Sequence, residues 1–171
     1  MVHILGCDHY LQEYELQDWQ DKIRKIERQL KEKFYSVTEE IILDQAVKFI
    51  GEECKPGQNT IPRKLGTELG CKYAEIDMNS EERERKAIPK GYERLGSDEQ
   101  KRCNALREDY MLERTYREST LETSKLIVCG ALHVEGLANR FRERGEEATT
   151  RNLLNEQWCD LPWDRMMRGE L

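Results

Sequence analysis

Short apolar runs alternate along the chain with stretches in which apolar residues recur every three or four positions. Four runs, at residues 2–5, 47–51, 71–76 and 126–129, are typical of buried strands. The stretches between them have the periodicity of amphipathic helices. This alternation predicts an α/β fold: a compact single domain with a mostly parallel central sheet of about four to five strands, flanked by amphipathic helices.

The predicted helices differ in length and in the signals that bound them. One amphipathic helix of about 18 residues is predicted by apolar residues spaced three or four apart: Leu16, Trp19, Ile23, Ile26 and Leu30. A loop or entry turn over residues 10–15 should precede it. Ser36 and Glu39 form a capping-box pattern, which predicts that a second helix begins there. Further helices are expected at residues 59–70, 97–121 and 135–145. Asn59 is the expected cap of the first, a capping box at Ser97 starts the second, and Gly145 follows the end of the third.

The end of the chain carries a weaker pattern. Residues 149–154 are compatible with an edge strand, and residues 158–171 read as a tail in which Trp158 and Trp163 are docking residues. We therefore expect one domain over residues 1–157 and a C-terminal tail over residues 158–171. A chain of 171 residues is long enough to bury a substantial core.

Charge and cysteine usage exclude several classes of protein. Acidic residues outnumber basic ones by 34 to 28, which gives a net charge of −6. This charge argues against a protein that coats nucleic acid or an anionic membrane. No apolar run is long enough to span a membrane, and the first residues lack a signal-peptide pattern. Six cysteines never form a Cys-x-x-Cys pair, so we expect reduced thiols, a cytoplasmic location and no zinc–thiolate centre.

A Gly-x-x-His motif follows two of the predicted strands. It occurs at Gly6/His9 and again at Gly130/His133. Two parallel strands would bring both histidines to the carboxyl edge of the sheet, where ligands bind in open α/β folds. Either histidine could instead be a satisfied structural residue. His3, inside the first strand, is expected to be an ordinary buried or edge histidine.

Charged residues follow the other strands. Glu52 and Glu53 come after the second strand, and because strand side chains alternate, one of them should point into the edge cavity. Asp77 follows the third strand. Arg107 and Arg114 are seven residues apart on the longest predicted helix and project from one face. A nucleophilic cysteine, Cys7 or Cys129, is a further alternative, although thiols in buried strands are poor nucleophiles.

Taken together, these short motifs resemble the TraB/Tiki and erythromycin-esterase/ChaN-like superfamily. The resemblance rests on segments 6–9, 49–53, 74–77, 107–114, 128–133, 136–137 and 144–145, in this order. Members include metal-dependent peptidases, an esterase that opens a macrolactone, and haem-binding lipoproteins. The resemblance implies an α/β fold with its site at the strand ends. This chain departs from the pattern in being short and in lacking the expected signal sequence.

The resemblance also implies roles for individual residues. His9 and His133 would be metal ligands or catalytic histidines, and Glu52 or Glu53 a base or ligand. Arg107 would clamp an anion or oxyanion, with Asp77 as a supporting acid. Asp8 and Arg114 are further supporting candidates near these motifs.

The residue types alone allow three classes of function. Two imidazoles with one or two carboxylates, His9, His133, Glu52 and Glu53, suit a divalent ion such as Zn, Mn or Co that activates water. A carboxylate-oriented histidine could also activate water without a metal, so a hydrolase acting on an ester or amide bond is favoured. The alternatives are a non-catalytic module that binds a metal, haem or small metabolite, and an interaction or defence protein. The expected partners are a small-molecule or peptide substrate and, as an open alternative, a second copy in a homodimer.

Overall fold

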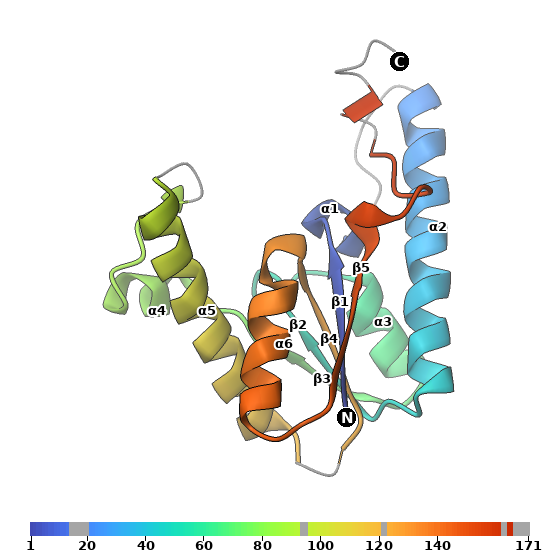
Figure 1. Ribbon diagram of the computed structural model, residues 1–171. Coiled ribbons are helices and arrows are strands. Elements are labelled where there is room, and N and C mark those ends of the chain that lie inside the picture. Colours follow the sequence, from blue (N-terminus) through green and yellow to red (C-terminus); the bar gives the residue numbers. More distant parts are fainter. Residues whose placement is uncertain (14–20, 93–95, 121–122, 162–163, 166–171) are drawn as a thin grey trace.

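Five parallel strands form a single sheet in the order β3-β2-β4-β1-β5 in the computed structural model (Figure 1). The structure describes residues 1–13, 21–92, 96–120, 123–161 and 164–165. The strands are β1 (Val2–Cys7), β2 (Phe49–Glu52), β3 (Lys72–Glu75), β4 (Lys125–Gly130) and β5 (Ala148–Asn152). The predicted α/β class and the parallel sheet are therefore confirmed.

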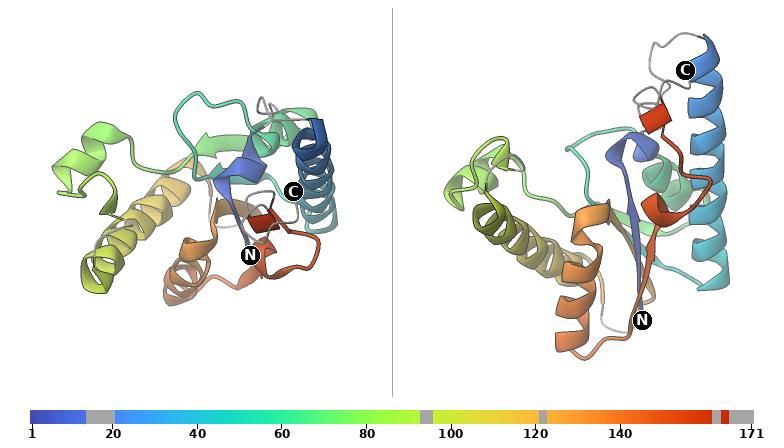
Figure 2. Two further views of the ribbon diagram at one scale, coloured as in Figure 1. Left: turned by 90° about the horizontal axis from the view of Figure 1, so that it is seen from above. Right: turned by 45° about the horizontal axis from the view of Figure 1, so that its top comes forward.

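Helices cover both faces of this sheet. On one face lie α2 (Asp21–Asp44) and α3 (Ile61–Glu68), and on the other lie α5 (Ser97–Glu118) and α6 (Val134–Glu143) (Figure 2). Shorter elements complete the described part of the chain: α1 (His9–Gln12), α4 (Ser80–Arg85) and the 3₁₀ turns η2 (Ala131–His133) and η3 (Leu153–Asn155).

Alternating side chains of the strands build two separate apolar layers. Leu5, Leu126 and Val128 point toward α2 and α3, where they join Phe34 and Leu65. The neighbouring strand positions, which include Ile4, Ile127 and Cys129, point the other way. They pack against α5 and α6, which contribute Met111 and Phe141. Both layers are almost completely shielded from solvent. Central strands buried on both faces explain why these segments read as continuous apolar runs rather than alternating ones.

The strand order creates a crevice at the centre of the carboxyl edge. β1 and β4 are hydrogen-bonded neighbours, yet the chain leaves β1 toward α2 and leaves β4 toward α6, on the opposite face. Such a reversal between adjacent strands is where open α/β sheets bind ligands, because the two departing loops leave a gap. The two Gly-x-x-His segments span the carboxyl ends of β1 and β4.

Three local predictions are corrected. Residues 9–12 form the short helix α1 instead of a loop, because Asp8 caps it by accepting a hydrogen bond from the Tyr10 backbone N–H at 2.9 Å. Ser36 does not start a new helix: α2 runs through it, and its hydroxyl donates to the Glu32 carbonyl at 3.0 Å. Helix α3 is capped by Thr60, one residue later than expected.

Other local predictions match the described residues. Gly145 follows α6 with a φ of 82°, the left-handed conformation that favours glycine after a helix. Helix α5 begins at Ser97, but the capping box predicted there is not formed, because Gly96 is the N-cap residue and no side chain caps this end. Trp158 packs against the apolar layer near α2, whereas Trp163, Leu16 and Trp19 lie outside the described residues. Across the described helices, no segment has the length and apolar character needed to cross a membrane.

Candidate functional site

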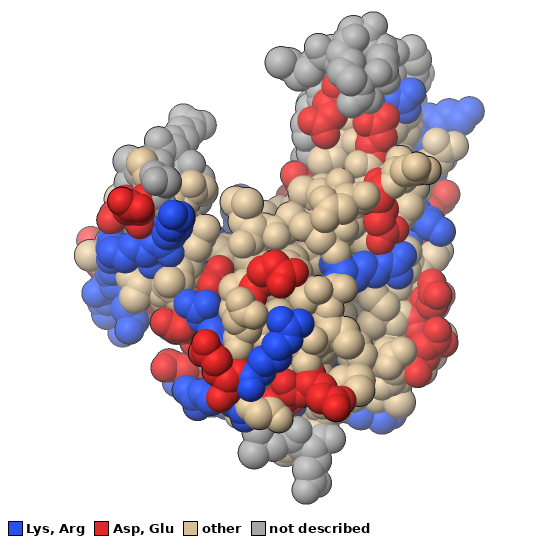
Figure 3. All heavy atoms as spheres, in the orientation of Figure 1, with Lys and Arg blue, Asp and Glu red and all other residues tan. Residues whose placement is uncertain are grey.

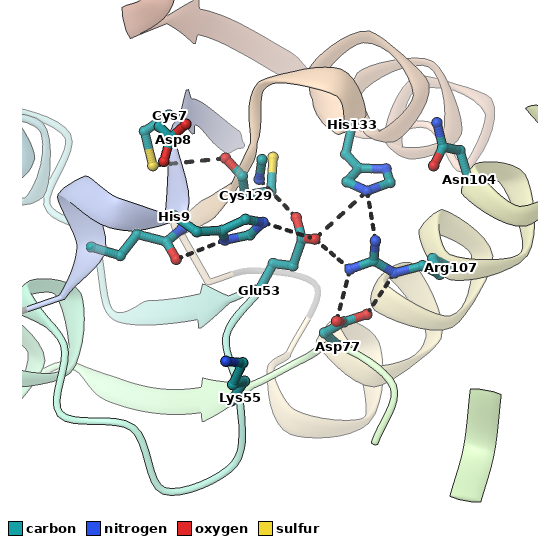
Figure 4. Close-up of polar contacts among 12 residues, drawn as sticks. Cys7, Asp8, His9, Glu53, Lys55, Asp77, Asn104, Arg107, Cys129 and His133 are labelled. Carbon is teal, nitrogen blue, oxygen red and sulfur yellow. Dashed lines mark hydrogen bonds and ion pairs between the residues drawn. The ribbon is translucent and has the colours of Figure 1, made fainter. Parts of the chain in front are cut away.

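Four strand ends and one helix bring their polar side chains together at the carboxyl edge of the sheet. His9 follows β1, Glu53 follows β2, Asp77 follows β3 and His133 follows β4 (Figure 4). Arg107 reaches the same point from α5. The two Gly-x-x-His motifs therefore meet, as expected from their placement after neighbouring parallel strands.

Glu53 is at the centre of the cluster and its side chain is only 1 % exposed. One oxygen, Oε2, accepts a hydrogen bond from the Gly130 backbone N–H at 2.7 Å. The other, Oε1, accepts from Arg107 and lies 3.4 Å from His9 Nε2 and 3.6 Å from His133 Nε2. Burial alone would raise the pKa of Glu53, but the hydrogen bond from His9 and the neighbouring positive charges hold it well below its usual range.

Arg107 uses all five of its N–H donors within the cluster. Nε and Nη2 each donate a hydrogen bond to Asp77, at 3.1 and 2.8 Å. Nη2 donates its second hydrogen to Glu53. Nη1 donates to the Tyr92 hydroxyl at 2.7 Å and to His133 Nε2 at 3.3 Å. The guanidinium lines the cavity, where the clamp role implied by the resemblance would place it, but it has no donor left for a substrate anion. The clamp role that the resemblance implies for Arg107 would need one of these contacts to be broken.

His133 lies behind Arg107 and its side chain is only 5 % exposed. Its Nδ1 is 3.1 Å from Glu108 Oε1, and Glu108 is in turn paired with Arg140 at 2.7 Å. Glu108 offers an acceptor and Arg107 offers a donor, so the neutral tautomer with hydrogen on Nδ1 satisfies both neighbours. In this arrangement His133 orients Arg107 and does not reach the cavity.

The close approach of Glu108 depends on a glycine in α6. A Cβ atom on Gly136 would lie 2.1 Å from Glu108 Oε2, which is a severe overlap. We expect Gly136→Ala to displace Glu108 from His133 and Arg140 and to lower the free energy of unfolding by about 1–3 kcal/mol. Urea unfolding followed by circular dichroism measures this. Gly66→Ala is the control, since its Cβ meets neighbours at an ordinary 3.5 Å and alanine favours the helix.

His9 is the exposed member of the cluster, with 56 % of its side chain accessible. Its Nε2 faces Glu53 and its Nδ1 is 3.1 Å from Gln12 Oε1, so both ring nitrogens have an acceptor. Partial burial would lower the pKa of His9, but the hydrogen bond and charge of Glu53 outweigh it and raise the pKa to about 9. The imidazole is therefore a cation at neutral pH.

This charge makes stability depend on pH. The raised pKa of about 9 means that the His9 contribution is complete below the ordinary value of 6.5 and is lost as the pH rises through about 9. We expect the free energy of unfolding to fall between these values in the wild type, with a smaller fall in His9→Gln. In NMR titrations the His9 ring should titrate near pH 9, and in Glu53→Gln near or below 6.5. A wild-type ring that titrates at 6.5 would contradict the proposed His9–Glu53 coupling.

A cavity of about 260 Å³ opens beside His9. Its wall includes Glu53, Asp77 and Arg107 as well as Lys55 and Arg83. Figure 3 shows the surface hollowed between the α4–α5 region and the upper part of α2, above the strand ends. A larger hollow of about 420 Å³ lies between α2 and α3, but no residue of the His9–Glu53 cluster lines it. The smaller cavity is therefore the one with candidate chemistry.

Glu52 does not belong to this cluster. Because strand side chains alternate, it points to the α3 face, where its Oε2 accepts from Thr60 at 2.6 Å and Tyr73 at 2.7 Å. Burial raises the pKa of Glu52 to about 7, although both hydrogen bonds oppose the rise. Of the two predicted glutamates, Glu53 is the one that faces His9.

Several other candidates serve the fold instead. Asp8 caps α1, and Arg114 lies on the surface of α5 with its guanidinium 3.7 Å from Glu118. Cys7 and Cys129 are fully buried, and burial raises the pKa of each thiol well above its usual value, so neither is a reactive thiolate. His3 is buried and pairs with the Thr149 hydroxyl at 2.8 Å.

The four suggested metal ligands do not form one donor set. Glu52 faces the other side of the sheet, and the Arg107 guanidinium contacts both Glu53 and His133, where a shared cation would have to lie. Across the described ranges, no group of three or more His, Cys, Asp or Glu side chains is arranged to hold a metal ion. The residues present therefore do not fit the suggested metal centre.

Sequence reasoning missed three residues that complete the cluster. Gln12 lies one helical turn after His9, and recognising Asp8 as a helix cap would have predicted their contact. Glu108 is adjacent to Arg107 in sequence and reaches His133 from the same helix. Tyr92 comes from the segment between α4 and α5, where no sequence signal indicated that its hydroxyl accepts from Arg107.

Comparison with known proteins gives no relative from which a role could be transferred. No protein-family model matches the chain, and searches of curated proteins and of solved structures found no significant match.

Proposed function

We propose that this protein hydrolyses an ester or amide bond, with His9 as the general base that takes a proton from the attacking water. The observation that carries the proposal is an exposed imidazole bonded through one nitrogen to a buried, locked carboxylate, at the edge of a cavity. This arrangement is how enzymes orient a basic histidine and stabilise the imidazolium that forms when it accepts a proton. The resemblance to the erythromycin-esterase/ChaN-like superfamily agrees with it.

The contacts with the Glu53 carboxylate and the Gln12 amide give the two ring nitrogens of His9 different roles. Glu53 keeps hydrogen on Nε2, so Nδ1 is the nitrogen that loses its proton in the active form. A water molecule must displace the contact between Nδ1 and Gln12 Oε1 before Nδ1 can remove a proton from it. In the cationic form Nδ1 donates to Gln12 Oε1, a neutral acceptor at 3.1 Å. Arg107, saturated by its five contacts, holds Glu53 in place and keeps it ionised. Glu53 and Arg107 act through His9 and are positioning residues.

The rate profile with pH tests the base role. A base whose pKa is raised to about 9 is mostly protonated at neutral pH, so kcat/KM should rise with pH toward a plateau above about 9. The measurement is the initial rate of release of 4-nitrophenol from short esters, and of 4-nitroaniline from peptide amides, above the buffer blank. Chelation with EDTA should leave the rate unchanged. A rate that falls as the pH rises from 7 to 9 would be evidence for an acid role and against this proposal.

A second candidate function is a binding module without turnover. It is favoured by the number of contacts that are already satisfied: both His9 nitrogens have acceptors and Arg107 has no spare donor. Such a saturated cluster resembles a rigid wall of a binding pocket. A protein that binds ligands in this cavity but releases no product from any ester or amide would favour this candidate.

A further inference from the structure

The charge of the cavity differs in sign from that of the chain. The whole sequence carries a net charge of −6. In the cavity wall, Lys55, Arg83 and Arg107, with His9 as a fourth cation below its pKa of about 9, face three carboxylates, Glu13, Glu53 and Asp77. A concave site with a local excess of one charge attracts ligands of the opposite charge.

The buried carboxylates of the wall are already neutralised. Arg107 bonds both Glu53 and Asp77, and Arg83 bonds Asp77 again at 2.5 Å. Glu13 remains at the rim, where it accepts a hydrogen bond from the Gln58 amide at 3.0 Å. The buried acidic groups therefore contribute little repulsion toward an incoming anion.

Lys55 supplies a cation that the described part of the protein does not use. It is exposed on the segment after β2, and among the described residues its ammonium group has no hydrogen bond or ion pair (Figure 4). Arg83 uses Nε for the Met78 carbonyl and Nη2 for Asp77, so its Nη1 group has no acceptor within the described chain. Both groups border the same cavity as the cationic His9.

We propose that the ligand of this cavity carries an anionic group, a carboxylate or a phosphate, which Lys55 binds with help from Arg83. The inference rests on the proposed function of the same cavity and gives its substrate class: an ester or amide with a negative charge a few atoms from the bond that is cleaved. An ammonium and a guanidinium are the usual partners of such groups.

Direct binding tests the inference without requiring turnover. Glutarate and inorganic phosphate are titrated into the full-length protein by isothermal calorimetry. We expect at least one of them to bind the wild type, Lys55→Gln to weaken that binding about fivefold, and Lys55→Arg to retain it. Lys48→Gln is the matched control, because Lys48 is an exposed lysine before β2, at the opposite end of the same strand. Absence of binding by both anions, or equal binding by Lys55→Gln and the wild type, would overturn the inference.

A pair of esters separates this inference from the hydrolase proposal. 4-Nitrophenyl butyrate is neutral, whereas 4-nitrophenyl hemiglutarate has the same leaving group and a terminal carboxylate. We expect the wild type to prefer the hemiglutarate and Lys55→Gln to lose that preference while still cleaving the butyrate. If neither ester is cleaved but glutarate binding depends on Lys55, the anion site stands and the hydrolase proposal fails. Equal rates on both esters in the wild type would contradict the substrate class.

Discussion

Replacing His9 by asparagine is expected to lower kcat/KM by about 10²–10⁴-fold, the usual contribution of general acid–base catalysis. Asparagine keeps a polar side chain of similar size but cannot take a proton from water. Because His9 is more than half exposed and its charge is lost above pH 9, the variant should be as stable as the wild type at that pH. The rate is therefore measured at pH 9 on the best ester found, with circular dichroism to show equal folding.

Two other histidines give matched controls for this substitution. His3→Asn changes a ring that pairs with Thr149 away from the cavity and should leave the rate unchanged. His133→Asn removes the ring nitrogen that is one of several acceptors of Arg107, so it should lower both the rate and the free energy of unfolding. A His9→Asn variant with the wild-type rate would refute the base role, whatever the other two variants do.

Replacing Glu53 by glutamine is expected to destabilise the protein by about 3–5 kcal/mol, because it leaves the buried Arg107 without one of its two anionic partners. The same change also weakens the contact with the Gly130 N–H. Urea unfolding at pH 8, analysed with a common slope, gives the difference in free energy of unfolding.

The neighbouring glutamate provides the control for that measurement. Glu52 is equally buried, but its pKa is raised to about 7, so ionised Glu52 opposes folding above pH 7. Glu52→Gln should therefore change the free energy of unfolding at pH 8 by no more than about 1 kcal/mol, or raise it. If both variants lost the same free energy of unfolding, the contact between Glu53 and Arg107 would not be the source of the effect.

The sequence predicted the location of the site better than the roles within it. The Gly-x-x-His spacing after two apolar runs was sufficient to bring His9 and His133 to one edge, because parallel strands share a direction. The sequence does not decide whether Glu52 or Glu53 points to the site, because that depends on which residue is the last paired one in β2. A shift of one residue along the strand moves each side chain to the other face of the sheet.

What the sequence left undetermined was which neighbours each side chain uses. The resemblance implies an anion-binding role for Arg107, but only the positions of Asp77 and Tyr92 reveal that its N–H donors are already used. The start of α1 was missed because four residues are too few to show helical periodicity. The continuity of α2 through Ser36 was missed because a capping pattern inside a helix looks the same as one at its start.

The strand order also determines when the domain can assemble during synthesis. β1, the first strand to leave the ribosome, pairs with β4 and β5 and with neither β2 nor β3. Its backbone partners in β4 are 123 residues later in the chain, as in the pair Val2 and Lys125. An apolar strand must therefore wait, unpaired, until β4 has been synthesised, which slows folding and exposes a segment that chaperones recognise. We expect nascent chains that stop before β4 to remain sensitive to protease at β1, and resistance to appear only after β4 and β5 have emerged.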